Sequence, residues 1–192
     1  MKLLIADDHP LFRLGLKAML EREGFKYILE AENGLDAVEK ALKYQPGAVL
    51  MDIKMPRMDG IEATRELRRR GYAGFIIMLT TFSEPALQVA AYKAGANAYL
   101  LKEASALEVA RTLYDLEQGH RTRFKPPTLP DLTERELEVL RGLSKGHSAK
   151  EIAFELGLSP ETVRDYIKKL YLKLGAHSRI EALEEARRLG LI

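Results

Sequence analysis

Residues 48–52, Ala48-Val49-Leu50-Met51-Asp52, form a short apolar run that ends in a carboxylate. A second run of the same kind covers residues 74–80, Gly-Phe-Ile-Ile-Met-Leu-Thr. Such short and nearly continuous apolar runs are typical of strands buried on both faces. The two runs therefore predict the centre of a sheet that carries helices on both sides.

Strand-like and helix-like segments alternate outward from these two runs. Because βα units alternate in this way in parallel sheets, the first part of the chain is predicted to be an α/β domain with a five-stranded, doubly wound parallel sheet. The other predicted strands are residues 2–6, 26–31 and 97–101, and the predicted helices are residues 11–23, 35–44, 61–70, 85–94 and 105–118.

The alternation ends at Gly119, where a basic and proline-rich stretch begins. Proline lacks a backbone N–H and breaks helices, so this stretch is predicted to be a linker. Beyond it the strand pattern disappears and four helical segments follow, at residues 133–144, 149–156, 160–174 and 178–189. We therefore expect an α/β domain at 1–118, a linker at 119–131 and a small all-α domain at 132–192. The basic residues and prolines of the predicted linker are Arg121, Arg123, Lys125, Pro126, Pro127 and Pro130.

Composition excludes several classes of protein. The 192 residues include no cysteine, which excludes disulfides, thiolate metal sites and cysteine nucleophiles. No apolar stretch approaches the ~20 residues that span a bilayer, and the N-terminal residues show no signal peptide, so we expect a cytoplasmic protein without membrane contact. The charge is −1 for residues 1–118 and +3 for 119–192, a weak indication of a polyanion partner for the second part.

Chemically versatile side chains follow the predicted strands of the first domain. Asp7 and Asp8 follow the first strand, Asp52 ends the third, Thr80 ends the fourth and Lys102 follows the fifth. The carboxyl ends of parallel strands share one edge, where ligands bind in open α/β sheets. Three carboxylates there repel one another unless a cation intervenes, and an oxygen-rich site suits Mg²⁺. The ammonium of Lys102 and the hydroxyl of Thr80 suit a phosphoryl group beside that metal.

The helix predicted at 160–174 has the features of a nucleic-acid-reading helix. Ser159 is a good N-cap, Pro160 suits the first turn, and a short turn with Gly157 joins it to the preceding helix. Its apolar face predicts packing on the other helices, while Arg164, Lys168 and Lys169 lie away from that face. This is the pattern of a helix-turn-helix. Charge and periodicity alone leave a plain helical bundle with solvated lysines equally open.

Residues 1–118 contain four specific motifs: Ile-Ala-Asp-Asp-His-Pro at 5–10, Met-Asp-Ile-Lys-Met-Pro-Arg-Met-Asp-Gly at 51–60, Leu-Thr-Thr-Phe at 79–82 and Gly-Ala-Asn-Ala-Tyr-Leu-Leu-Lys at 95–102. Together these motifs resemble the receiver domain of two-component response regulators, a flavodoxin-like fold. The resemblance implies that Asp52 is the phosphoacceptor of a histidine kinase and that Mg²⁺ is held by Asp7, Asp8, Asp52 and the Lys54 carbonyl. It also implies that Thr80 and Lys102 bind the phosphoryl oxygens and that Tyr99 is the switch aromatic.

Residues 130–192 contain four further motifs: Leu132–Leu140, Lys150–Ala153, Ser159–Arg164 and Lys173–Arg179. Together these motifs resemble the LuxR-type DNA-binding domain, and the whole chain resembles a NarL/FixJ-type response regulator. The resemblance implies that the helix starting at Pro160 binds double-stranded DNA and that the last helix contributes to a homodimer. The expected DNA-binding residues are Thr162, Arg164, Asp165, Lys168 and Lys169, of which the acidic Asp165 departs from the family pattern.

The predicted function is a DNA-binding transcriptional regulator that is controlled by phosphorylation and is not an enzyme. Two alternatives remain: an aspartyl-phosphate hydrolase, and a phosphorylation-independent regulator with a vestigial pocket. Three local predictions accompany this interpretation. Lys54 and Phe82 shield the acyl phosphate from water, His9 caps the turn before Pro10, and Gly60 supplies a positive φ in the loop after Asp52.

Overall fold

The computed structural model describes residues 1–120 and 124–192, so Arg121 and Arg123 of the predicted linker lie outside the described residues. The chain divides into two compact units, one made of residues 1–83 and 87–126 and the other of residues 84–86 and 127–192. Each unit has a hydrophobic core of its own. No helix in the described ranges is both long enough and apolar enough to cross a bilayer.

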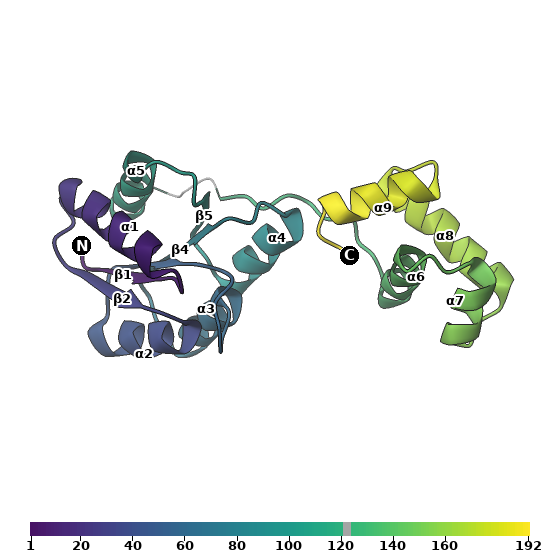
Figure 1. Cartoon of the computed structure of the whole chain (residues 1–192), viewed down its shortest axis with the longest axis horizontal. Helices are drawn as coiled ribbons and strands as arrows, with labels where there is room; N and C mark the ends of the chain where they lie inside the picture. The colour runs from purple at the N-terminus through teal and green to yellow at the C-terminus, as the bar shows by residue number, and fades with distance from the viewer. Residues whose placement is uncertain (121–123) are drawn as a thin grey trace. The chain divides into compact units, whose positions relative to one another are not determined.

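The first unit contains a five-stranded parallel sheet in the order β2-β1-β3-β4-β5. The predicted alternation of strands and helices is confirmed, and helices cover both faces of the sheet (Figure 1). The strands are β1 Leu3–Ala6, β2 Ile28–Ala31, β3 Ala48–Met51, β4 Phe75–Thr80 and β5 Ala98–Leu101; the helices are α1 Pro10–Arg22, α2 Gly34–Tyr44, α3 Gly60–Arg69, α4 Pro85–Ala94 and α5 Ala106–Glu117.

Two apolar layers hold the helices on the sheet. One face of the sheet packs on α1 and α5 through residues such as Leu20 and Leu113, which are fully buried. The other face packs on α2, α3 and α4 through residues such as Ala41, Leu67 and Ala91. As the two continuous apolar runs predicted, β3 is buried along its whole length and β4 is buried beyond its first residue. The neighbouring strand β1 is also fully buried.

The second unit consists of four helices in its described residues: α6 Glu134–Ser144, α7 Ala149–Leu156, α8 Pro160–Leu174 and α9 Arg179–Arg188. Each helix begins with a Ser or Thr whose hydroxyl accepts from a backbone N–H in the first turn. Glycine ends α7 and α8: Gly157 and Gly175 both adopt a left-handed conformation, at φ 65° and 66°. The predicted helical segments of this unit are thereby confirmed.

Glu136 is a buried carboxylate that ties α6 to α8. Its Oε2 atom accepts from Lys173 Nζ at 2.7 Å and from the backbone N–H of Thr133 at 2.8 Å. Burial by itself raises the pKa of the Glu136 carboxyl, but the bonds from Lys173 and Thr133 outweigh it and lower that pKa below its usual value. The charged form of Glu136 therefore stabilises the fold.

Glu136→Gln should lower the free energy of unfolding of this unit at neutral pH by about 1.5–3 kcal/mol, the range for a hydrogen bond to a charged group. Since the folded-state pKa is depressed, the stabilisation is complete above the unfolded-state pKa of about 4.3 and is lost as the pH falls through the folded-state pKa. The difference between wild type and variant should therefore shrink on acidification.

Native-state hydrogen exchange of the α6 and α8 amides, at several pH values in the full chain, measures this difference. Glu138→Gln is the matched control, because Glu138 lies on the same helix and pairs only with a solvent-exposed arginine, Arg135 at 2.8 Å, among the ion pairs of the described residues. An equal loss of protection in both variants, or a difference that grows with acidity, would contradict the assignment.

Candidate functional site

The register of the sheet brings the predicted acidic residues together. Ala6 of β1 pairs with Met51 of β3, so Asp7 and Asp52, which follow them, leave the sheet side by side. The backbone N–H of Asp52 donates to the carbonyl of Ala6 at 2.8 Å, which extends the ladder to this point. Both carboxylates are nearly inaccessible to solvent. Two like charges in one buried site require a positive partner.

Lys102 supplies that partner from the end of β5. Its Nζ lies 2.6 Å from Asp7 Oδ2 and 2.7 Å from Asp52 Oδ2. Burial works to lower the pKa of this ammonium, but its bonds to Asp52 and Asp7 outweigh burial and raise the pKa of Lys102. The ring of Phe12 from α1 lies 4.7 Å from the same Nζ. Lys102 is thus held charged between the two carboxylates.

The acidic cluster has the composition of a site for a hard cation. Oxygen or nitrogen atoms of Asp7, Asp8, His9 and Asp52 all lie within 4.8 Å of one another. The Oδ1 atom of Asp8 is buried and has no hydrogen-bond partner in the described part of the chain; His9 Nδ1 lies 2.9 Å away but in an orientation that forms no hydrogen bond. Three carboxylates against one ammonium leave an excess of negative charge, so the residues present fit Mg²⁺.

Thr80 and Tyr99 lie beside this cluster on β4 and β5. Thr80 is fully buried, and its Oγ1 finds no hydrogen-bond partner within residues 1–120 and 124–192. A buried hydroxyl without a partner is costly, and a phosphoryl oxygen would satisfy it. Tyr99 donates its hydroxyl to the carbonyl of Phe82, two residues beyond Thr80, at 2.6 Å.

Lys54 and Phe82, two residues beyond Asp52 and Thr80, contact each other. Lys54 is exposed, and its Nζ lies 4.0 Å from the centre of the Phe82 ring, which is cation–π geometry. The two side chains come from the segments that follow β3 and β4, respectively. The structure brings these two predicted shielding residues into direct contact with each other, which the sequence did not reveal.

Two local predictions about this region were wrong. His9 occupies the N-cap position of α1 but makes no side-chain cap, because its ring lies against Asp7 and Asp8 instead. Gly60 does not have a positive φ; in its loop the left-handed residue is Arg57, at φ 68°. Glycine is required at position 60 for a different reason, since a Cβ there would collide with the backbone carbonyl of Asp52. No cis peptide occurs among the described residues, so the Lys102–Glu103 peptide is trans.

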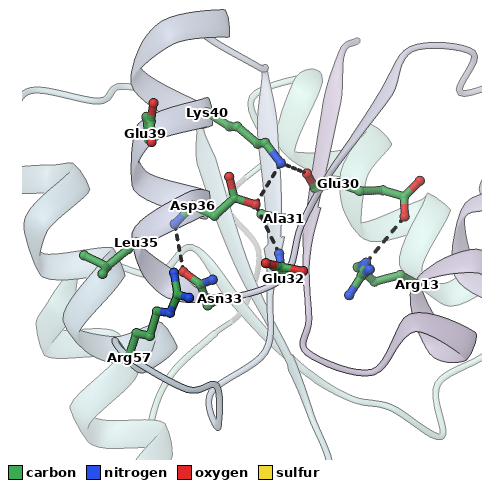
Figure 2. Close-up of a pocket in the computed structure, with 10 residues that line it drawn as sticks. All are labelled: Arg13, Glu30, Ala31, Glu32, Asn33, Leu35, Asp36, Glu39, Lys40 and Arg57. Carbon is green, nitrogen blue, oxygen red and sulfur yellow. Dashed lines mark hydrogen bonds and ion pairs between the residues drawn. The ribbon is translucent and has the colours of Figure 1, made fainter.

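A hollow of about 610 Å³ beside the acidic cluster does not contain the predicted site residues (Figure 2). It opens at the end of β2 and the start of α2. Four of its charged side chains form ion pairs: Lys40 with Asp36 at 2.7 Å and Arg13 with Glu30 at 3.4 Å. Glu32, Glu39 and Arg57 also line the hollow and have no ion-pair partner among the described residues, so its charges are neutralised only in part.

The wall between this hollow and the acidic cluster comes from α1 and the end of β2. Arg13 donates to the backbone carbonyl of Asp7 at 2.6 Å, and Lys17 reaches Glu30 at 2.9 Å. The pKa of the Glu30 carboxyl is lowered, chiefly because of its hydrogen bond with Lys17. Exposed or half-exposed pairs of this kind contribute little stability one by one. Their common effect is to fix the backbone that presents Asp7.

In the second unit, α7 and α8 form the predicted helix-turn-helix. Val163 and Leu170 are buried against the other helices, so the opposite face of α8 is open to solvent. Thr162 lies in the first turn, and its backbone N–H donates to the capping hydroxyl of Ser159 at 3.1 Å. The remaining predicted DNA-binding residues are exposed on α8: Arg164, Asp165, Lys168 and Lys169.

Comparison with known proteins identifies a family for each unit. Residues 3–113 match the response regulator receiver domain, and residues 130–186 match the bacterial regulatory proteins of the luxR family. The transcriptional regulatory protein YdfI of Bacillus subtilis is 36% identical over 100% of this chain and 97% of its own length. The chain belongs to the LuxR-type response regulators.

Other relatives of this response regulator extend the likeness to solved structures. Response regulator UvrY of Escherichia coli is 35% identical over 98% of this chain and 94% of its own. The structure of the two-component response regulator RcsB in complex with DNA is 26% identical, with a TM-score of 0.73, over 98% of both chains.

The sequence missed three contributors to the acidic cluster of the response regulator. His9 contacts the carboxylates, Phe12 packs over Lys102, and Arg13 binds the Asp7 carbonyl. All three lie at the start of α1, within six residues of Asp7. Their nearness in the chain was a signal, but side-chain direction at the first turn of a helix depends on how that helix packs.

Proposed function

We propose that this response regulator receives a phosphoryl group on Asp52 from a sensor histidine kinase, and that phosphorylation promotes a homodimer that binds double-stranded DNA through α8 and controls transcription. The observation that carries the proposal is the placement of the Asp52 carboxylate. It lies 2.7 Å from the Lys102 ammonium and in one cluster with two further carboxylates. Thr80, whose buried hydroxyl has no partner in the described residues, ends the neighbouring strand β4. Each of these groups has a use in phosphoryl transfer.

The roles of the pocket residues follow from their chemistry. Asp52 is the nucleophile; Lys102 and Thr80 receive the phosphoryl oxygens. Asp7, Asp8 and Asp52, with the carbonyl of Lys54, would hold Mg²⁺, which when bound offsets the negative charge between a carboxylate and an incoming phosphate. Tyr99 lies next to the segment after Thr80, where it is placed to respond to a movement of that residue.

The DNA-binding role rests on the exposed face of α8. Lys and Arg there neutralise phosphates, while residues in the first turns of such a helix reach the base edges. We assign this role to Thr162, Arg164, Asp165, Lys168 and Lys169. We propose domain limits of 1–118 for the receiver, 119–131 for the linker and 132–192 for the DNA-binding domain, and action in the cytoplasm.

Two other functions fit the geometry less well. An aspartyl-phosphate hydrolase needs a second acid or base positioned to activate water, but the residue two positions beyond Asp52 is Lys54, whose ammonium contacts the Phe82 ring. A regulator with a vestigial pocket has no reason to keep Asp7, Asp52 and Lys102 in one buried ion-pair cluster. Turnover of a small phosphomonoester would support the first, and DNA affinity of Asp52→Ala equal to that of the phosphorylated wild type would support the second.

Asp52→Asn should abolish labelling of the protein by a small phosphodonor while leaving the fold intact, because the amide is nearly isosteric but is not a nucleophile. Chelation of Mg²⁺ should block labelling of the wild type. Labelling followed by intact-protein mass spectrometry measures both. Asp115→Asn is the matched control, since Asp115 is an exposed aspartate on α5 and its loss should leave labelling unchanged. Undiminished labelling of Asp52→Asn would remove the basis of the proposal.

Lys54→Asn and Phe82→Ala should each shorten the half-life of the phosphorylated protein by a factor of about 2–5, which corresponds to an exposed cation–π contact of about 0.5–1 kcal/mol. Because the two side chains cover the pocket by contacting each other, the double variant should be little faster than either single one. Loss of the label with time measures the half-life, and Lys26→Asn, at an exposed loop lysine, is the control. Unchanged half-lives would show that this pair does not exclude water.

Asp165→Asn should tighten binding to all DNA sequences, because Asp165 is an exposed acid on the helix that meets the phosphates, and should steepen the salt dependence. Titrations of the full chain on a duplex selected from random sequences, and on unrelated duplexes at several salt concentrations, measure both effects. Lys168→Ala should weaken binding and flatten the salt slope by about one unit, and Glu184→Gln on α9 should change neither.

If Asp165 instead accepts a hydrogen bond from cytosine N4, the asparagine variant should lose about 1–3 kcal/mol at one base position only. That result would show that Asp165 recognises a base and does not act mainly by repelling the DNA phosphates. Unchanged affinity in both the Asp165 and Lys168 variants would show that α8 does not read DNA.

A further inference from the structure

Phe124 of the linker packs on the receiver unit beside Tyr99. The two rings are stacked, with centroids 5.9 Å apart and an interplanar angle of 25°. Phe124 also meets Tyr92 of α4 edge to face at 5.8 Å. Phe124 is partly buried and joins the apolar layer that holds α2, α3 and α4 on the sheet. The linker therefore has an aromatic anchor on the α4–β5 face of its own receiver unit.

The far end of Tyr99 is tied to the segment that carries Thr80. The Tyr99 hydroxyl donates to the carbonyl of Phe82, and the Phe82 ring in turn contacts the Lys54 ammonium. Phe82 is two residues from Thr80, whose buried hydroxyl is unpaired in the part of the chain described here. One aromatic side chain thus connects the phosphoryl-binding segment at its hydroxyl to the linker at its ring.

The packing around Phe124 is loose enough to change. A hollow of about 490 Å³ adjoins the ring between Phe75, Tyr92 and Leu116, and another of about 320 Å³ adjoins it between Tyr99, Thr112 and Lys125. An aromatic ring with open space on two sides is held by its ring contacts rather than by a closed socket. Its docking is therefore sensitive to the rotamer of Tyr99.

We infer that filling of the phosphoryl pocket favours stacking of the Phe124 ring on Tyr99, and that this stacking docks the linker on the α4–β5 face. This inference rests on the proposed phosphorylation of Asp52. The direction follows from Thr80. In the arrangement where Phe124 stacks on Tyr99, the Thr80 hydroxyl is buried and lacks a partner that a phosphoryl oxygen would supply. The stacked arrangement is thus one in which a buried polar group remains available to the phosphoryl group.

Coupling of this kind is reciprocal. If a filled pocket favours stacking of Phe124, then loss of the Phe124 ring must weaken the binding of a phosphoryl mimic at Asp52. The linker joins the receiver unit to the DNA-binding unit, so a change in its docking is a direct means of transmitting phosphorylation to the second unit. One aromatic contact carries that transmission.

Isothermal titration calorimetry of the full chain with beryllofluoride, in the presence of Mg²⁺, measures the dissociation constant that the reciprocal effect should change. Phe124→Ala should raise the dissociation constant for beryllofluoride about three- to tenfold, which is what one aromatic pair of this kind supplies. Phe124→Leu keeps an apolar side chain and should have an intermediate effect. Tyr27→Ala is the matched control, since Tyr27 is an exposed aromatic residue of the same unit that precedes β2.

A fluorescent reporter tests the docking itself. The chain contains no tryptophan, so Phe124→Trp introduces a single indole, and the hollows beside the ring leave room for it. Beryllofluoride should shift the emission of this variant to shorter wavelength, whereas Leu107→Trp, at an exposed position on α5, should show no shift.

Three results are distinguishable. If wild type does not bind beryllofluoride, the proposed function fails, and the inference fails with it. If wild type binds but Phe124→Ala, with an unchanged circular dichroism spectrum, binds equally well, only the inference is overturned. A weaker affinity in Phe124→Ala, together with an emission shift in Phe124→Trp that is absent from Leu107→Trp, supports it.

Discussion

The ammonium of Lys102, held between the carboxylates of Asp7 and Asp52, is the interaction on which the site depends. These three residues follow β5, β1 and β3, so one small group of charges joins the carboxyl ends of three strands. Two carboxylates that share one ammonium repel each other by several kcal/mol at an effective dielectric of about 20. Lys102 offsets that repulsion but leaves a net negative charge, which explains why the same residues suit both a divalent cation and a phosphoryl group.

The two units use charge in opposite ways. In the receiver, opposite charges are buried and concentrated at one edge of the sheet. On α8 they are exposed and basic residues are in excess, although two of them pair along the helix: Arg164 lies 3.1 Å from Glu161 and Lys168 lies 3.9 Å from Asp165. Exposed pairs of this kind are screened by salt and are easily exchanged for phosphate partners. The first arrangement suits the binding of a small, highly charged group, and the second suits the surface of a polyanion.

The sequence by itself determined the elements of both units and the residues at the edge of the sheet. Its information is local: apolar runs such as 48–52 mark buried strands, and Ser159 with Gly157 marks the helix-turn-helix within a few residues. Hydrogen bonds of caps span only three residues, so they are visible in the chain. The resemblance of the motifs to known families added the roles of Asp52, Thr80 and Lys102, which patterning alone does not assign.

Only the tertiary structure decided which of these side chains touch. The contact of Lys54 with Phe82, the turn of His9 toward Asp7 and Asp8, and the closeness of Gly60 to the Asp52 carbonyl all depend on strand order and on how loops from different strands meet. The stacking of Phe124 on Tyr99 joins residues on either side of α5. Such contacts carry no periodicity in the sequence, because they are fixed by packing between segments whose separation in the chain is arbitrary.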